Sequence, residues 1–183
     1  MVIGMGNPGR KYAATRHNLG FKVLDALADR LDINVTKRKF NARLGEGEVA
    51  GKKLILLKPM RFMNLSGQVA ATAAGFYRIE AADMLVVSDD MALPTGKIRL
   101  KAKGSAGGHK GLADVLEKLG TENVPRLRIG IGPADRQDAV DYVLDRPGCE
   151  EKGLLVEAVA KARDAVLCWL EFGIETAMNR FNV

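Results

Sequence analysis

The hydrophobic residues of this chain follow two alternating patterns. Short apolar runs that end in glycine or acidic residues are typical of buried strands, and they occur at residues 2–5, 84–87 and 127–131. Four helices are predicted, at residues 23–31, 66–77, 111–119 and 155–170. Apolar residues spaced three or four positions apart, which are typical of amphipathic helices, identify the first and the last. We expect Ser66 to cap the second of these helices and Gly120 to end the third.

A β-hairpin is also predicted, because residues 42–49 and 53–57 flank the turn Gly51-Lys52. Strands that alternate with helices, together with one hairpin, predict a single domain over residues 1–183. Its expected fold is a three-layer α/β/α sandwich around a twisted mixed β-sheet. Ligands usually bind at the carboxyl ends of the strands in such sheets. The loops after Met5 and Val87 are therefore the expected site.

Composition agrees with one globular domain, since 47% of the 183 residues are hydrophobic and 27% are charged. No stretch is apolar enough to span a bilayer, and the first residues do not resemble a secretory leader. We therefore expect a cytoplasmic protein. The two cysteines, Cys149 and Cys168, have no neighbours at metal-ligand spacing, so neither a zinc site nor a disulfide framework is expected.

Positive charge is concentrated in the first part of the chain, where residues 1–131 carry a net charge of +10 and residues 132–183 a net charge of −4. Every second position from Lys97 to Lys103, including Lys101, is basic, so a strand here would project its cations from one face. Phosphates lying across this face would relieve the repulsion. An edge strand that uses lysine against aggregation is the alternative. Arg126 and Arg128 would extend the surface.

Only two histidines are present, His17 and His109, and both lie in predicted loops. Histidine is the side chain best suited to act as a general base near neutral pH. Asp89 follows a buried strand, where it could accept the N–H of His17, fix its tautomer and so allow the imidazole to activate water. Alternatively, His17 is structural and Asp89 caps the turn before Leu93.

Two other chemistries are disfavoured by sequence context. Residues 4–9 match the spelling G-x-G-x-x-G of a dinucleotide-binding turn, but Pro8 and a long polar loop follow where that motif requires a helix. A serine hydrolase would need a G-x-S-x-G elbow, which the sequence lacks. We expect the glycines of residues 4–9 to turn the backbone tightly so that Asn7 points into a cleft.

Five sequence blocks occur in an order that is specific when they are taken together. They are Gly6-Asn7-Pro8-Gly9 with Tyr12 and Thr15-Arg16-His17-Asn18, Met63-Asn64-Leu65-Ser66-Gly67, Asp89 with Leu93-Pro94, Gly107-Gly108-His109, and Arg128-Ile129-Gly130-Ile131-Gly132. This order resembles the bacterial-type peptidyl-tRNA hydrolase family.

The resemblance implies a monomer that hydrolyses the ester between a peptide and its tRNA, without a metal or cofactor. It also implies contacts with the acceptor stem and CCA end of the tRNA, and no protein partner. His17 looks like the family's general base, Asp89 like the residue that stabilises its basic form, and Asn7 like the one that distinguishes N-acylated from free aminoacyl-tRNA. The implied substrate-binding and tRNA-binding residues are Tyr12, Phe62, Asn64, His109, Lys110, Lys101 and Arg128.

The chain departs from the family pattern at two positions. Lys110 stands where asparagine is usual, and Arg61 stands where threonine is common. Lys110 loses an acceptor and gains a cation, which alters its expected contact with the 3′ end. Two alternative functions remain open at this point: a catalytically silent RNA-binding protein on the same fold, and a hydrolase with no RNA partner.

Overall fold

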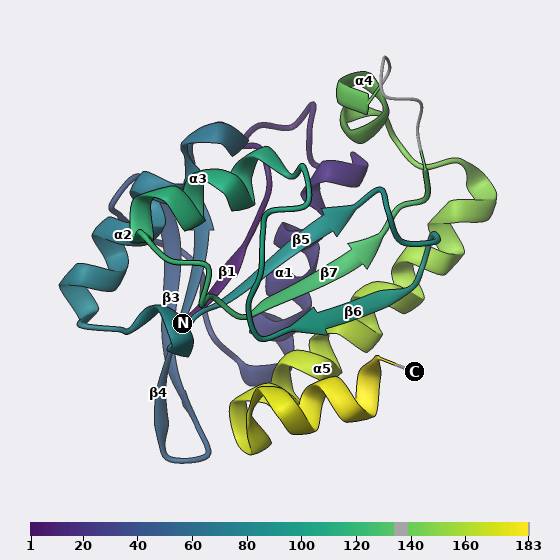
Figure 1. The fold of residues 1–183 in the computed structure, drawn as a ribbon. Coiled ribbons are helices and arrows are strands. Elements are labelled where there is room, and N and C mark those ends of the chain that lie inside the picture. Colours follow the sequence, from purple (N-terminus) through teal and green to yellow (C-terminus); the bar gives the residue numbers. More distant parts are fainter. Residues whose placement is uncertain (134–138, 183) are drawn as a thin grey trace.

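The structure is a computed structural model that describes residues 1–133 and 139–182 (Figure 1). Within these residues a seven-stranded mixed sheet has the order β2-β3-β4-β1-β5-β7-β6. The strands are β1 Val2–Gly4, β2 Lys37–Lys39, β3 Ala42–Val49, β4 Lys52–Pro59, β5 Leu85–Asp90, β6 Ile98–Lys101 and β7 Arg126–Gly130. The four central strands β4, β1, β5 and β7 run parallel, and antiparallel strands flank them on both sides.

Helices cover both faces of the sheet and complete the three predicted layers (Figure 1). One face is covered by α1 (Leu19–Leu31) and α5 (Cys149–Phe181), and the other by α2 (Ser66–Tyr77) and α3 (Lys110–Leu119). A short helix, α4 (Ala139–Leu144), lies above the carboxyl ends of the strands. Three 3₁₀ turns complete the elements: η1 (Arg16–Asn18), η2 (Met63–Leu65) and η3 (Ala81–Asp83).

The central strands are apolar because both of their faces are buried, as is usual in a parallel sheet. Successive side chains of β1 point to opposite faces, so Val2 packs into the core beneath α1 and α5, whereas Ile3 packs into the core beneath α2 and α3. Leu85 and Val86 of β5 divide in the same way, and all four side chains are fully buried. This rigid centre fixes where the polar ends of β1 and β5 lie.

The long C-terminal helix that the apolar spacing predicted is α5, and it packs across β6 and α1. Its helical path is interrupted at Gly173, whose φ of 84° is one that other residues rarely adopt. After the helix, the Asn182 side chain binds the backbone N–H and C=O of Leu100 and ties the end of α5 to the edge strand. No helix in the described part of the chain is both long and apolar enough to cross a membrane.

Several local predictions were wrong. Ser66 does not cap α2: it is the first helical residue, and its buried Oγ has no hydrogen-bond partner among the described residues. The Asp114 carboxylate instead accepts from the Gly67 N–H at this helix end, so the acceptor comes from α3. The hairpin turn lies one residue earlier than predicted, at Ala50 and Gly51, both with positive φ.

One strand, β2, and one α-helix, α4, were not predicted at all. Strand β2 has the sequence Lys37-Arg38-Lys39 and lacks the apolar alternation that identifies a strand. It forms as an edge strand by pairing with β3. Helix α4 is only six residues long, which is too short to give a reliable periodic signal.

Candidate active site

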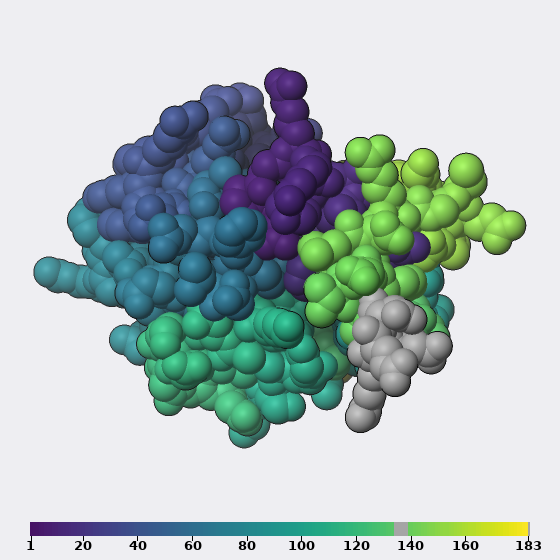
Figure 2. Space-filling view, turned by 90° about the horizontal axis from the view of Figure 1, so that it is seen from above, coloured from purple at the N-terminus to yellow at the C-terminus, as the bar shows by residue number. Residues whose placement is uncertain are grey.

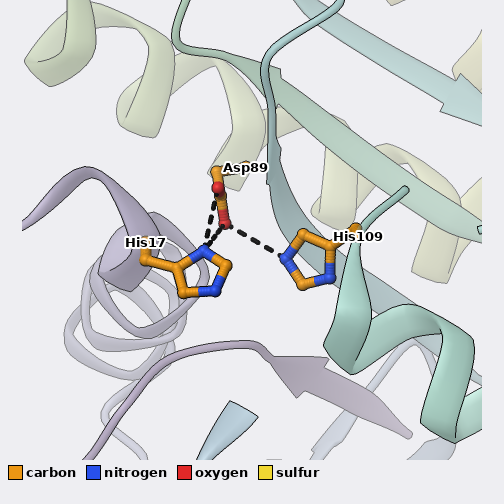
Figure 3. Close-up of side chains that lie close together, drawn as sticks. All are labelled: His17, Asp89 and His109. Carbon is orange, nitrogen blue, oxygen red and sulfur yellow. Dashed lines mark hydrogen bonds and ion pairs between the residues drawn. The ribbon is translucent and has the colours of Figure 1, made fainter. Parts of the chain in front are cut away.

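The predicted pair of His17 and Asp89 is formed by two segments that lie far apart in the sequence (Figure 3). Strand β5 continues through Asp89 and Asp90, so the Asp89 carboxylate is held at the carboxyl end of a central strand. His17 lies in η1, immediately before α1. Its Nδ1 lies 2.8 Å from one Asp89 oxygen and 2.9 Å from the other. The geometry therefore places the predicted base and the predicted carboxylate in direct contact.

A reciprocal pair of asparagines anchors the segment that carries His17. The Asn7 N–H donates to the Asn18 side-chain oxygen at 2.8 Å, and the Asn18 amide donates to the Asn7 carbonyl at 2.9 Å. Both residues are almost fully buried. The loop after β1 and the start of α1 are thereby joined, and His17 is held at a fixed position between them.

The same network orients the Asn7 side chain. Its oxygen accepts the Met63 N–H at 2.9 Å, which leaves the amide nitrogen as the group that faces the cavity lined by Asn7 and His17. An amide N–H in this position is suited to donate to a carbonyl oxygen or to a water molecule. The sequence predicted that Asn7 points into a cleft, and the structure adds the contact that determines which amide atom it presents.

His109 also contacts Asp89, which the sequence did not indicate. Its Nε2 lies 3.2 Å from the Asp89 oxygen that His17 contacts, and the two rings have their centroids 5.1 Å apart (Figure 3). Gly107 and Gly108, both with positive φ, turn the chain so that His109 becomes the N-cap residue of α3. His109 Nδ1 accepts the Leu112 N–H at 3.0 Å. The positive φ values explain why glycines precede this histidine.

These contacts determine which nitrogen of each neutral imidazole carries the proton. His109 accepts a backbone N–H at Nδ1, so its proton lies on Nε2 and is donated to Asp89. His17 faces the carboxylate with Nδ1, so its proton lies there and its Nε2 has a free lone pair. Such a tautomer is the one a general base requires.

Asp89 remains ionised because two imidazoles surround it. Only 3% of its surface is exposed. Burial alone would raise its pKa, but His109 and His17, through their positive charge when protonated and their N–H donation, together outweigh burial and hold the pKa of Asp89 well below its usual range. An ionised Asp89 stabilises the positive charge that His17 acquires when it takes a proton.

His17, Asp89 and His109 are also spaced like a metal site, since their potential ligand atoms lie within 4.8 Å of one another. In the hydrogen-bonded arrangement, however, His17 Nδ1 and His109 Nε2 point at the carboxylate and carry the protons that a metal would have to displace. The observed geometry is therefore that of two donors sharing one acceptor.

The two histidines and Asp89 line a cavity of about 670 Å³ at the carboxyl ends of the strands. Of the ten predicted site residues, nine line this cavity: Asn7, Tyr12, His17, Phe62, Asn64, Asp89, His109, Lys110 and Arg128. Phe62 is 58% exposed, so most of its surface is available for contact with a ligand. The tenth residue, Lys101, is exposed on β6 outside the cavity.

The cationic surface is smaller than the sequence suggested. Arg99 and Lys101 project from the exposed side of β6, as the alternation predicted, and Arg99 lies opposite Arg128 on β7. Arg128 Nη2 forms an ion pair with Asp90 at 2.6 Å. Arg126 is buried, contrary to prediction, and donates to backbone carbonyls at Gly104, Ser105, Glu122 and Val124.

Asp89 does not cap the turn that follows β5. The neighbouring Asp90 accepts the Ala92 N–H at 2.9 Å and so performs that role. The two adjacent carboxylates therefore have separate tasks: Asp90 holds the turn and Arg128, whereas Asp89 holds the two imidazoles. This division removes the alternative interpretation of Asp89 that the sequence left open.

Comparisons with known proteins agree over the whole chain. The family model for peptidyl-tRNA hydrolase matches residues 1–183. The chain belongs to this family. Peptidyl-tRNA hydrolase from Caldanaerobacter subterraneus subsp. tengcongensis is 49% identical over 182 residues, covering 100% of this chain and 98% of that protein. The protein of the same name from Shouchella clausii is 45% identical over 183 residues, covering 100% and 99%.

The fold is that of the peptidyl-tRNA hydrolases. The crystal structure of the Acinetobacter baumannii peptidyl-tRNA hydrolase matches with a TM-score of 0.95 and 37% identity, covering 100% of this chain and 93% of the other. These findings confirm the family, the fold and the hydrolase class predicted from the sequence.

Proposed function

We propose that this chain hydrolyses the ester bond of peptidyl-tRNA and that His17 is the general base. The observation that carries this proposal is the contact of His17 Nδ1 with the buried Asp89, which leaves Nε2 free on a residue that lines the cavity. Membership of the peptidyl-tRNA hydrolase family supplies the substrate class.

The proposed reaction is a direct attack by water. His17 Nε2 takes a proton while the water oxygen bonds to the ester carbonyl carbon, and Asp89 stabilises the imidazolium that forms. The Asn7 amide and the neighbouring Asn64 are the proposed donors to the carbonyl oxygen as it becomes negative. The C–O bond to the terminal ribose then breaks, and the imidazolium returns the proton to the departing oxygen. No metal or cofactor takes part in this proposal.

The cationic residues have a separate proposed task, which is to bind the tRNA. Lys110 and Arg128 line the cavity, and Arg99 and Lys101 lie on the adjoining edge strand. Contacts of this kind with phosphates position RNA without reading its sequence, which suits an enzyme that accepts every tRNA.

Tyr12 and the exposed Phe62 are proposed to contact the bases at the 3′ end. His109 is proposed to stabilise the ionised form of Asp89 by donating its Nε2–H to the carboxylate, and also to contact the substrate. We further propose that the protein acts in the cytoplasm as a monomer without a protein partner.

The test compares N-acetyl-leucyl-tRNA with leucyl-tRNA under the same conditions. We expect the first to release N-acetyl-leucine and the second to remain intact. Binding of both without hydrolysis would identify a silent RNA-binding protein and refute the proposal. Hydrolysis of small N-acyl amino acid esters at a rate that Lys101→Ala and added tRNA leave unchanged would identify a hydrolase with no RNA partner.

A further inference from the structure

The cavity has two sides of different chemistry. Lys110 and Arg128 lie on the side formed by α3 and β7, whereas α4 contributes apolar side chains. The apolar lining residues of this helix are Ala139, Val140, Val143 and Leu144. Figure 2 shows α4, in green, beside the purple N-terminal segment that carries His17. A peptidyl-tRNA has a matching division, because its RNA is a polyanion and the side chains of its peptide are frequently apolar.

Helix α4 needs outside contacts to keep its position. It has six residues, and isolated helices of that length are unstable in water. Arg16, the residue before His17, supplies several of these contacts. Its Nη1 donates to the Tyr142 carbonyl at 3.1 Å, its backbone N–H donates to the Asp145 carbonyl at 3.1 Å, and its guanidinium carbon lies 4.2 Å from the centroid of the Tyr142 ring.

Arg16 is itself held by the first turn of α5. Its Nε and Nη2 donate to the two carboxylate oxygens of Glu151 at 3.3 and 2.7 Å. Glu151 also accepts the Gly148 N–H at 2.8 Å, which fixes this carboxylate against the start of the helix. Arg16 is 7% exposed. A bidentate ion pair between a largely buried arginine and a carboxylate is among the strongest polar contacts in proteins.

Arg16 and Glu151 each favour the charged form of the other. The Arg16 hydrogen bonds lower the pKa of Glu151, and burial only partly opposes them. Burial would lower the pKa of Arg16, but the hydrogen bond and charge of Glu151, with the nearby Tyr142 and Asp145, together outweigh burial and raise that pKa. The Tyr142 hydroxyl meanwhile donates to the Ile131 carbonyl just beyond β7. Arg16 thus joins the His17 segment, α4 and α5 at one point.

We propose that Arg16 is a positioning residue for the apolar side chains of α4 that line the cavity. By holding α4 at a fixed distance from His17, Arg16 allows these side chains to bind the acyl (peptide) part of the substrate. This inference rests on the proposed function and adds a division of labour to it. The His17 and Asp89 pair does not depend on Arg16, because Asp89 is held by β5 and η1 is tied to the β1 loop through Asn7 and Asn18. Loss of Arg16 should therefore weaken substrate binding more than it slows the chemical step.

The test compares KM and kcat of wild type and Arg16→Met. The substitution keeps much of the side-chain volume and removes the guanidinium donors to Glu151 and Tyr142. If α4 then occupies its position about one-tenth of the time, KM for N-acetyl-leucyl-tRNA rises about tenfold, while kcat stays within about twofold. N-acetyl-glycyl-tRNA offers no apolar side chain, so its KM should rise less. Arg16→Lys, which retains the charge, should recover part of the loss. Arg163→Met removes an arginine of α5 that pairs with Asp164 and should leave both constants unchanged.

Each outcome decides the inference. An unchanged KM for Arg16→Met, an equal rise for the leucyl and glycyl substrates, or a fall in kcat at constant KM would overturn it. If thermal unfolding shows that Arg16→Met does not fold, Glu151→Gln, which removes the charge from the partner, must show the same split at about threefold. Wild-type protein that fails to hydrolyse N-acetyl-leucyl-tRNA would refute the proposed function itself, which keeps the two failures distinguishable.

Discussion

Replacement of Asp89 by asparagine keeps the shape of the side chain and removes the carboxylate. The carboxylate accepts from His17 Nδ1 through both oxygens and from His109 Nε2 through one of them. An asparagine amide can instead donate to His17 Nδ1, which moves the imidazole proton to Nε2. His17 would then have no lone pair facing the cavity, and the proposed base would be lost.

The expected loss can be estimated from the same change elsewhere. In the serine protease triad, aspartate-to-asparagine substitution lowers kcat about 10⁴-fold by imposing the wrong tautomer. Asp89 makes the equivalent contact at 2.8 Å, so we expect a decrease of about 10³- to 10⁴-fold, or about 4 to 5.5 kcal/mol of transition-state stabilisation. The assay is single-turnover release of N-acetyl-leucine from N-acetyl-leucyl-tRNA at saturating enzyme, with thermal unfolding to confirm that the variant folds.

Asp90→Asn is the matched control for this experiment. It alters the adjacent carboxylate, which holds Arg128 and the Ala92 N–H but does not contact either histidine in the described hydrogen bonds. We expect kcat to fall less than about tenfold. If folded Asp89→Asn also lost less than tenfold, or if the two substitutions were equally harmful, the tautomer argument would be refuted.

Substitutions at three further positions test other parts of the structure. His109→Asn can still cap α3, but its side chain is shorter than the imidazole and loses the contact that Nε2 makes with Asp89. We therefore expect kcat to fall about tenfold with little change in unfolding temperature, whereas His109→Ala should also lose about 1 kcal/mol of stability. Equal stabilities of the two variants would contradict the cap. Lys101→Ala should weaken tRNA binding and lower the slope of log affinity against log salt by about 1, and an unchanged slope would exclude this contact. Hydrogen bonds from Lys37, Lys53 and then Tyr77 lower the pKa of the exposed Glu46 to about 2 from 4.5. A carboxyl group whose pKa is lower in the folded than in the unfolded chain stabilises the fold at every pH above the unfolded pKa. Glu46→Gln should therefore lower the unfolding temperature at pH 7, and the difference from wild type should disappear as the pH falls from 4.5 to about 2. A difference that persists at pH 2 would have another cause.

The sequence predicted those features that depend on local pattern. Apolar runs identified the central strands, because both faces of these strands are buried. The spacing of apolar residues and the residues that end helices identified α1, α3 and α5, each of which buries one face against the sheet. Asp89 directly follows the strand predicted at residues 84–87, which placed it at the carboxyl ends of the strands, where ligands usually bind. The contact between His17 and Asp89 was predicted from residue chemistry and family resemblance together, and the geometry agrees with it.

Features that depend on contacts between distant segments were missed. The role of Arg126 could not be predicted, since its burial depends on carbonyls of the 104–124 segment that are brought together around its side chain only in the folded chain. Likewise, Asp114 supplies the acceptor at the start of α2 because α2 and α3 pack closely, which displaces the predicted Ser66 cap. The family resemblance assigned His109 to substrate binding, and nothing in the sequence indicates that the two histidines share one aspartate.

The central claim is that a single imidazole, freed at Nε2 by its contact with Asp89, activates the attacking water. The most direct measurement is the turnover of N-acetyl-leucyl-tRNA by His17→Ala, alongside its affinity for tRNA. We predict that turnover falls more than about 10³-fold while tRNA affinity stays within about twofold, because phosphate contacts lie on other residues. A folded His17→Ala protein that retained wild-type turnover would contradict the account.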